Sequence, residues 1–264
     1  MAILVYTGGG MNNYKLTLQY DGSRYNGWQK QNDTGNTIQQ ILTDIISGYT
    51  GERIKLIGSG RTDAGVHALG QVANFRCRCR IEPDAFMEKA NKALPEDIRI
   101  IKVQQAADAF HSRYSSLGKT YVYRLDTGSV RSVFERKYSW RIEEDINLCA
   151  MRKAAVHLTG EHDFRAFCTD AKEMPYTVKN IYSIEFHENY SCLKNQKIPG
   201  IIEIEYSGSG FLYNMVRILT GTLVDIGLGK FRPDDIETML SAGVRSGTGQ
   251  LAPAKGLLLK NVEY

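Results

Sequence analysis

Alternating and helical spacings of hydrophobic residues divide the first half of the chain into strands and helices. Between Lys15 and Tyr20, leucines alternate with polar residues, which predicts a strand with one buried face. Isoleucines and a leucine at helical spacing predict a helix over 37–46, with Thr37 as its N-cap and Gly48 beyond its end. The same reasoning predicts strands at 53–57 and 71–81 and a helix at 83–93.

The second half mixes the same elements without strict strand–helix alternation. The pattern predicts strands at 120–125, 138–142, 181–186 and 201–206, and helices at 147–158 and 211–226. This mixture indicates an α+β fold, with largely antiparallel sheets and helices on one face of each. A faint internal repeat aligns Leu16–Tyr25 with Ile202–Phe211, in each case a strand that enters a Tyr-x-Gly-Ser turn. A true repeat implies two similar lobes, 12–110 and 111–264, on either side of a cleft; convergent turn chemistry is the alternative.

Composition is that of an ordinary globular protein. Of the 264 residues, 42% are hydrophobic and 23% are charged, which excludes long disordered or fibrous segments. The most apolar stretch, Phe211–Gly229, is interrupted by Arg217 and Asp225, so no membrane span is expected. Five cysteines in a chain of this size favour reduced thiols and a cytoplasmic location.

Charge is concentrated in one stretch. The net charge of 33 − 29 = +4 identifies no partner, but residues 111–141 hold seven basic groups against two acidic ones, interleaved with six aromatic residues. The basic groups are Arg113, Lys119, Arg124, Arg131, Arg136, Lys137 and Arg141. Cations that neutralise phosphates and rings that stack on unpaired bases suit RNA. The alternative is a solvated ribbon with a half-buried aromatic face.

The spacing of glycines and cysteines argues against two common kinds of site, a phosphate-binding loop and a metal site. Gly118-Lys-Thr lacks the first glycine of a phosphate-binding loop, because Arg113 stands there, and a strand follows it. Cys77-x-Cys79 has no second closely spaced Cys or His pair to complete a metal site. Period two also places these cysteines on the opposite strand face from Arg76, Arg78 and Arg80, a face that suits either a nucleic-acid backbone or solvent.

Arg217 and Asp63 are the two residues whose surroundings suggest chemistry. Arg217 is the only charged residue between Glu205 and Asp225, within a predicted apolar helix. A buried guanidinium needs a carboxylate partner, although an arginine that extends to the surface is the simpler possibility. Asp63, in the glycine-rich loop 58–65, is the candidate partner; its alternative role is that of a turn residue that satisfies backbone amides.

Six ordered motifs resemble the tRNA pseudouridine synthase A family. The most specific is Gly58-Ser-Gly-Arg-Thr-Asp-Ala-Gly-Val-His-Ala68. The others are Tyr20–Gln29, Lys119–Tyr123, Gly160–Phe164, Phe211–Arg217 and Ala252–Leu257. The resemblance covers about Lys15 to Tyr264 and leaves out only the first dozen residues.

The resemblance implies an enzyme that converts uridine to pseudouridine at positions 38 to 40 of the tRNA anticodon stem-loop. It also implies homodimers of two-lobed subunits with a basic RNA-binding cleft, and it implies no cofactor and no metal. By motif position, Asp63 is the nucleophile and Arg217 pairs with it. Tyr121 stacks on the target uracil, Arg61 helps to hold the flipped nucleotide, and Leu257 forms an apolar wall.

Two segments depart from the family pattern, and two other functions stay open. Gln39–Thr43 lacks an acidic residue that is frequent there, and Asp170–Lys179 has Lys179 where arginine is common. An RNA-binding module that has lost its chemistry is the first alternative. An Asp-dependent nucleoside glycosidase is the second, and it needs a second carboxylate such as Asp163 or Asp225.

Overall fold

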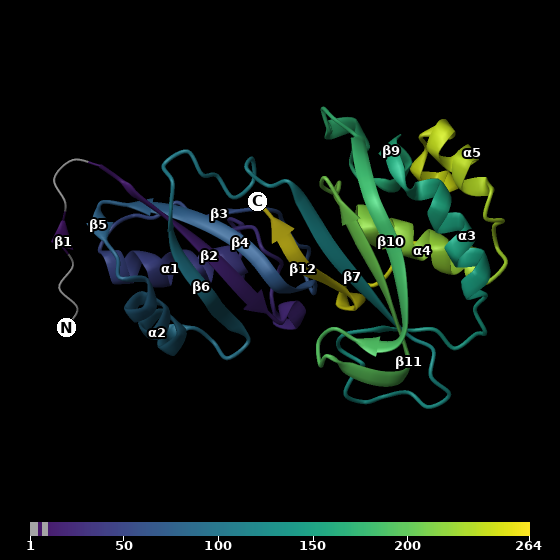
Figure 1. Cartoon of the computed structure of the whole chain (residues 1–264), viewed down its shortest axis with the longest axis horizontal. Coiled ribbons are helices and arrows are strands. Elements are labelled where there is room, and N and C mark those ends of the chain that lie inside the picture. The colour runs from purple at the N-terminus through teal and green to yellow at the C-terminus, as the bar shows by residue number, and fades with distance from the viewer. Residues whose placement is uncertain (1–4, 7–9) are drawn as a thin grey trace. The chain divides into compact units, whose positions relative to one another are not determined.

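A computed structural model describes residues 5–6 and 10–264 of the chain, and it shows an α+β protein (Figure 1). The helices are α1 (Ile38–Thr50), α2 (Pro83–Ala93), α3 (Leu148–Leu158), α4 (Met215–Gly227) and α5 (Asp235–Ala242). The principal strands are β2 (Asn12–Tyr20), β4 (His67–Cys77), β6 (Ile98–Ala106), β7 (Gly118–Asp126), β10 (Val178–Ser191), β11 (Gln196–Gly208) and β12 (Leu257–Glu263). Shorter strands are β1 (Val5–Tyr6), β3 (Ile57–Gly58), β5 (Cys79–Arg80), β8 (Trp140–Arg141) and β9 (Gly160–Asp163).

The chain forms two compact units. The first comprises Met1–Leu117 together with Leu259–Tyr264, and the second comprises Gly118–Leu258. The C-terminal strand therefore ends in the unit that contains the N-terminus. The two lobes expected from the sequence, 12–110 and 111–264, stay a prediction. The two compact units are defined by how closely their residues pack, and not by whether each folds independently.

The first unit has its sheet in the order β6-β2-β4-β12, with β3 paired to β4. Strand β2 is antiparallel to both β4 and β6. Phe86 of α2 lies 6.1 Å from Phe75 of β4 and 4.9 Å from Tyr49 of α1, measured between ring centroids. Both helices therefore cover the face of the sheet that Phe75 belongs to.

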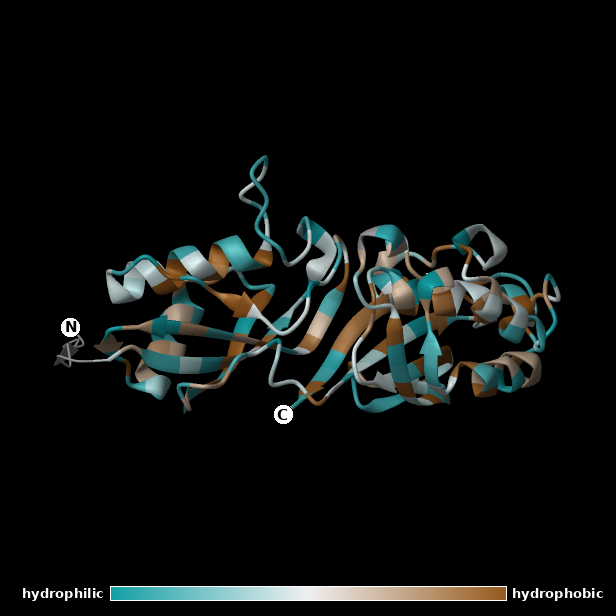
Figure 2. Ribbon diagram, turned by 90° about the horizontal axis from the view of Figure 1, so that it is seen from above, coloured by the Kyte–Doolittle hydropathy of each residue, from teal (hydrophilic) through white to brown (hydrophobic). Residues whose placement is uncertain are grey.

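The second unit has the order β7-β11-β10-β9, antiparallel throughout, with β8 added parallel to β7. Every residue of α4 except Arg217 is buried, so this helix forms the centre of the unit. In both units, hydrophobic and hydrophilic residues alternate along the strands and around the helices, as the pattern of the sequence predicts (Figure 2).

Several predicted elements are confirmed with small shifts. The helix over 83–93 has the predicted bounds, and Asn147 caps α3 by accepting a hydrogen bond from the Ala150 amide. Thr37 caps α1 in the same way, but the helix continues past Gly48. It ends at Gly51, whose φ of 70° is in the left-handed region that favours glycine.

Two predicted elements are wrong at their ends, each for a local reason. Residues 53–56 are not a strand, because Ile54 N–H and the Leu56 carbonyl bond to the side chains of Ser47 and Gln39 in place of a neighbouring strand. The helix predicted from Phe211 begins only at Met215, because Asn214 has a φ of 61° and interrupts it.

The strand predicted over 71–81 starts earlier, at His67, and is interrupted at Arg78. There the Glu52 carboxylate accepts the amides of Arg78 and Cys79. The strand predicted over 138–142 is reduced to Trp140–Arg141.

Candidate active site

The loop between β3 and β4 carries Asp63 with its side chain half-buried, between the exposed residues Arg61 and Ala64. Both flanks of Asp63 are tied down. The Thr62 carbonyl accepts the Trp28 amide at 2.9 Å, and the Asp63 carbonyl accepts the Val66 amide at 3.1 Å. The loop therefore fixes the backbone on each side of Asp63 and leaves its carboxylate at the surface of the unit.

A buried layer of uncharged side chains supports this loop from below. The hydroxyls of Tyr20 and Thr62 are 2.8 Å apart and buried. Gln71, fully buried, accepts from the Ser59 hydroxyl at 3.1 Å and donates to the Gly60 carbonyl at 3.0 Å. Because every polar atom in such a layer needs a partner, this network admits few alternative positions of the loop.

Two glycines of the segment 20–29 allow the close approach between this segment and the Asp63 loop. A Cβ on Gly22 would lie 2.0 Å from the Val66 carbonyl oxygen, and a Cβ on Gly27 would lie 2.7 Å from that of Thr62. Gly27 also has a φ of 85°. Tyr20–Gln29 and Gly58–Ala68, far apart in sequence, thus form one structure in the first unit.

His67 belongs to the same support. It is buried, and its Nδ1 accepts the Gly22 amide at 3.0 Å and lies 3.1 Å from an Asp21 oxygen. The imidazole therefore ties the turn at Asp21 and Gly22 to the start of β4.

In the second unit, three of the motifs form another cluster. Tyr121 of β7 is 8% exposed, and its ring meets Phe211 edge to face at 5.3 Å between centroids. Arg217 Nε donates to the Ala252 carbonyl at 2.8 Å, and its Nη1 donates to the Asn214 side chain at 2.9 Å. Arg217 is half-buried and not fully buried, so solvent reaches part of this residue.

Tyr123 joins the third motif to this cluster. Its hydroxyl donates to the Pro253 carbonyl at 2.7 Å, and a Cβ on Gly256 would lie 2.6 Å from its ring. Burial raises the pKa of Tyr123 well above its usual value, with the Arg217 charge acting in the opposite direction. Leu257, which follows directly, is 6% exposed and starts β12.

The structure therefore sorts the candidates into two groups. Arg61 and Asp63 share one loop in the first unit, while Tyr121, Arg217 and Leu257 are joined through neighbouring residues in the second. The sequence did not indicate that Tyr20 and Gln71 support the Asp63 loop. The internal repeat includes Tyr20, but no pattern in the sequence indicated which residue its hydroxyl would contact.

The basic stretch 111–141 is only partly available to a ligand. Arg124 is fully buried, with its Nε 2.9 Å from Glu203 and its Nη2 2.8 Å from Glu135. Of the seven basic groups in this stretch, Arg124 is not available to RNA, because two buried carboxylates need its charge. Arg113, Arg131, Arg136 and Lys137 are exposed.

One group of donor atoms has the composition of a metal site. Oxygen of Glu52 and the sulfurs of Cys77 and Cys79 all lie within 4.8 Å of one another. No pattern in the sequence pointed to Glu52. Each donor already has a partner: Glu52 accepts two backbone amides, and the Cys77 thiol donates to the Cys79 carbonyl at 3.3 Å. Burial also raises the pKa of both thiols, which opposes the thiolate form that binds metal.

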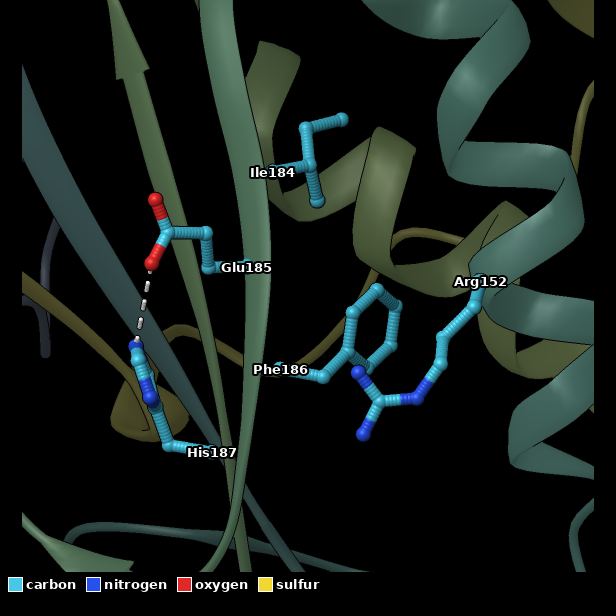
Figure 3. A pocket seen from close by; sticks show the side chains of 5 residues that line it. All are labelled: Arg152, Ile184, Glu185, Phe186 and His187. Atoms are coloured by element: carbon cyan, nitrogen blue, oxygen red, sulfur yellow. Dashed lines mark ion pairs between the residues drawn. The ribbon is translucent and has the colours of Figure 1, made fainter.

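A pocket outside the candidate site lies between α3 and β10 (Figure 3). Arg152 stacks its guanidinium on Phe186, 4.9 Å from the ring centroid, and pairs with Glu188 at 2.7 Å. Figure 3 shows Glu185 and His187 on the opposite side of the strand from Phe186. These residues form no single converging set of groups.

The two carboxylates considered for a glycosidase are engaged elsewhere. Asp225 is buried, pairs with Lys230 at 2.8 Å and accepts both the amide and the side chain of Gln250 at 3.0 Å. Asp163 caps the Arg165 amide at 3.0 Å.

A family model described as tRNA pseudouridine synthase matches residues 17–115 and 154–264, which is most of the chain. The chain belongs to the tRNA pseudouridine synthase family. It is 42% identical to "tRNA pseudouridine synthase A 2" of a Bacillus cereus strain over 254 residues, 96% of this chain and 100% of that protein. "tRNA pseudouridine synthase A 1" of Clostridium tetani is 43% identical over the same shares.

Membership of the tRNA pseudouridine synthase family confirms two expectations from the sequence, the family and an isomerase that acts on tRNA. The matched ranges of the family model omit 116–153, which include Tyr121 and the basic stretch after β7. None of the helices in the described ranges has the length and hydropathy to cross a bilayer.

Proposed function

We propose that this chain isomerises uridine to pseudouridine at positions 38 to 40 of the tRNA anticodon stem-loop, with Asp63 as the nucleophile. The observation that supports this best is the Asp63 loop. Its carboxylate is half-buried at a surface, while the backbone on both sides is bonded to Trp28 and Val66. A nucleophile held in one position loses little freedom when it attacks, which lowers the barrier.

The reaction explains why a single carboxylate can be enough. The N1–C1′ glycosidic bond breaks, the uracil turns, and C5 bonds to C1′; C5 then loses its hydrogen as a proton to solvent, and N1 takes up a proton from solvent. Substrate and product are isomers, so no electrons are gained or lost and the chemistry needs no redox cofactor. Covalent attachment to Asp63, at uracil C6 or at sugar C1′, keeps the two pieces together while they reorient.

The remaining residues take their roles from this step. A base in a stem must leave its stack, at a cost of a few kcal/mol, and stacking on Tyr121 offsets about 1–3 kcal/mol of it. Arg217 supplies the cation that pairs with Asp63. Arg61 helps to hold the flipped nucleotide, and Leu257 provides an apolar wall of the pocket.

We further propose a homodimer with a basic RNA-binding cleft, in the cytoplasm. None of the five cysteines, all of which lie in the described part of the chain, forms a disulfide, as expected of a reducing compartment. The resemblance to the family is the support for the dimer and the cleft.

The competing functions predict different products. An RNA-binding module binds tRNA and leaves it unchanged, and a glycosidase releases free uracil. The engagement of Asp225 with Lys230 and Gln250 disfavours the glycosidase, because the second carboxylate is already neutralised.

The test is to map pseudouridine in an unmodified tRNA transcript after incubation with the wild type, the Tyr121→Phe variant and the Arg217→Lys variant. Carbodiimide treatment and primer extension locate each product nucleotide. We expect stops at positions 38 to 40 with the wild type and with Tyr121→Phe, whose ring still stacks, and far fewer with Arg217→Lys. Modification confined to another region of the tRNA would contradict the proposed site, and free uracil would indicate the glycosidase.

A further inference from the structure

The segment between β7 and β8 exposes apolar residues that a folded protein normally buries. We call residues 130–137 the Phe134 loop. Phe134 is 78% exposed, Val130 is 83% exposed and Val133 is 61% exposed. An exposed phenylalanine beside two exposed valines costs solvation free energy unless a partner covers it, so the loop has the character of a contact surface.

The backbone of this loop is fixed from inside the second unit. Glu135, next to Phe134, is 1% exposed and lies 2.8 Å from Arg124 and 2.7 Å from Lys194. Its carbonyl accepts the Ser139 hydroxyl at 2.8 Å. Because Glu135 points inward, its neighbours Phe134 and Arg136 are held outward. The backbone that carries Phe134 is therefore held in place before any partner arrives, which reduces the entropy lost on binding.

Charge indicates what kind of partner fits. Arg131, Arg136 and Lys137 are all exposed in the same loop, and its one acidic residue, Glu135, is buried and neutralised. The outer surface is thus cationic and aromatic. A polyanion with unpaired rings matches this combination, and single-stranded segments of RNA have both phosphates and exposed bases.

The loop adjoins the candidate site of the second unit. Lys255 donates to the Arg136 carbonyl at 3.1 Å. Lys255 belongs to the segment Ala252–Leu257, in which Ala252 accepts the Arg217 guanidinium and Leu257 follows. A nucleic acid bound at Tyr121 and Arg217 therefore has the Phe134 loop as an immediate neighbour.

We propose that the Phe134 loop binds tRNA next to the target uridine, with the Phe134 ring stacked on an unpaired base and the three cations paired with phosphates. The proposal rests on the proposed function, because it takes tRNA as the substrate. It concerns a segment outside the residues that the family model matches, so it goes beyond what family membership implies.

The experiment measures the Kd for an unmodified tRNA transcript and the KM of pseudouridine formation for Phe134→Ala, Phe134→Leu and Phe134→Trp. Loss of the ring should raise Kd about tenfold in Phe134→Ala and nearly as much in Phe134→Leu. Phe134→Trp, which keeps an aromatic ring, should have the wild-type Kd. The effect should appear in KM more than in kcat. Val156→Ala, which alters a 71% exposed residue of α3, serves as the control and should bind tRNA as the wild type does.

Each other outcome overturns the proposal. Equal Kd values for the wild type and Phe134→Ala would show that the ring does not stack, and failure of Phe134→Trp to restore binding would show that apolar bulk is what matters. A change in oligomeric mass with unchanged Kd would identify the loop as an interface between copies of the chain. A wild type that binds tRNA but forms no pseudouridine would refute the proposed function, while the Kd comparison would still test the loop.

Discussion

The strands β2 and β11 occupy equivalent places in the two units. Each is the central strand, with antiparallel neighbours on both sides. Each has, at or near its end, a buried tyrosine whose hydroxyl meets a threonine: Tyr20 and Thr62 at 2.8 Å, Tyr206 and Thr220 at 2.9 Å. These tyrosines are aligned in the internal repeat, and in each unit a helix follows the strand, α1 after β2 and α4 after β11.

The two units differ in what the tyrosine supports. Tyr20 bonds to the loop that carries Asp63, while Tyr206 bonds to the helix that carries Arg217. Below the Asp63 loop the supporting side chains Tyr20, Thr62 and Gln71 are uncharged. The second unit adds a buried charge cluster, Arg124 with Glu135 and Glu203, under the Phe134 loop. The same strand and turn can thus hold different functional segments, with neutral support in one unit and ionic support in the other.

The largest effect should follow from breaking the ionic support. Arg124→Ala leaves the buried Glu203 carboxylate without its cation and Glu135 with Lys194 alone, and we expect the unfolding free energy to fall by ~3–5 kcal/mol. Arg24→Ala is the control from the first unit: its pair with Asp97 is at the surface, with Arg24 67% exposed, and its loss should lower the unfolding free energy far less. Urea denaturation measures both. Equal losses would contradict the contrast between the units.

The next largest effect should come from alanine substitutions at the glycines of the two turns, Gly22 and Gly208. An added Cβ lies 2.0 Å from the Val66 carbonyl oxygen at Gly22 but 2.8 Å from the Asn180 carbonyl oxygen at Gly208. We expect Gly22→Ala to cost ~3 kcal/mol and Gly208→Ala ~1 kcal/mol, because backbone can shift less in the first case. Thermal or urea unfolding checks the order, and the reverse order would show that the first turn has room.

Removal of each tyrosine hydroxyl separates stability from activity. Tyr20→Phe and Tyr206→Phe each leave a buried threonine without this partner, at ~1–2 kcal/mol. Only Tyr20→Phe should also lower kcat through a less well-held Asp63, with KM for tRNA little changed. Comparison of the two variants at a temperature where both are folded provides the measurement. An equal effect on kcat would mean that Tyr20 has no special link to Asp63.

The smallest effect concerns pH. Burial alone raises the pKa of Glu135, but hydrogen bonds from Lys194 and Arg124 outweigh it and hold the pKa below its usual 4.5. A carboxylate with a lowered pKa in the folded state stabilises it at neutral pH, and this contribution disappears as pH falls through the lowered value. Lys194→Met should flatten the loss of stability below about pH 4.5, measured by urea unfolding across pH. An unchanged slope would show that Glu135 titrates normally.

Sequence reasoning succeeded where the signals are local. The bounds of α2 follow from Pro83 at a helix start, and the Thr37 cap of α1 follows from a capping residue before an apolar run. It failed at residues 53–56, since their amides and carbonyls bond to side chains of α1 that no local pattern reveals.

The candidate site shows the same limit. Motif resemblance found Asp63 and Arg217, but composition could not show that Arg124 pairs with Glu135 and Glu203, the latter 79 residues away. Gln71 was equally hidden, because its partners Ser59 and Gly60 come together with it only in the folded unit.

In the proposed reaction, Asp63 is the nucleophile of pseudouridine formation. Release of tritium from a tRNA transcript labelled at uracil C5 reports this reaction itself, because the product keeps no hydrogen at C5 once C5 has bonded to C1′. The wild type and Asp44→Asn, which alters an exposed carboxylate of α1, should release tritium at the same rate, whereas Asp63→Ala should release none while still binding tRNA. Release by Asp63→Ala, or none by a well-folded wild type that binds tRNA, would contradict the account.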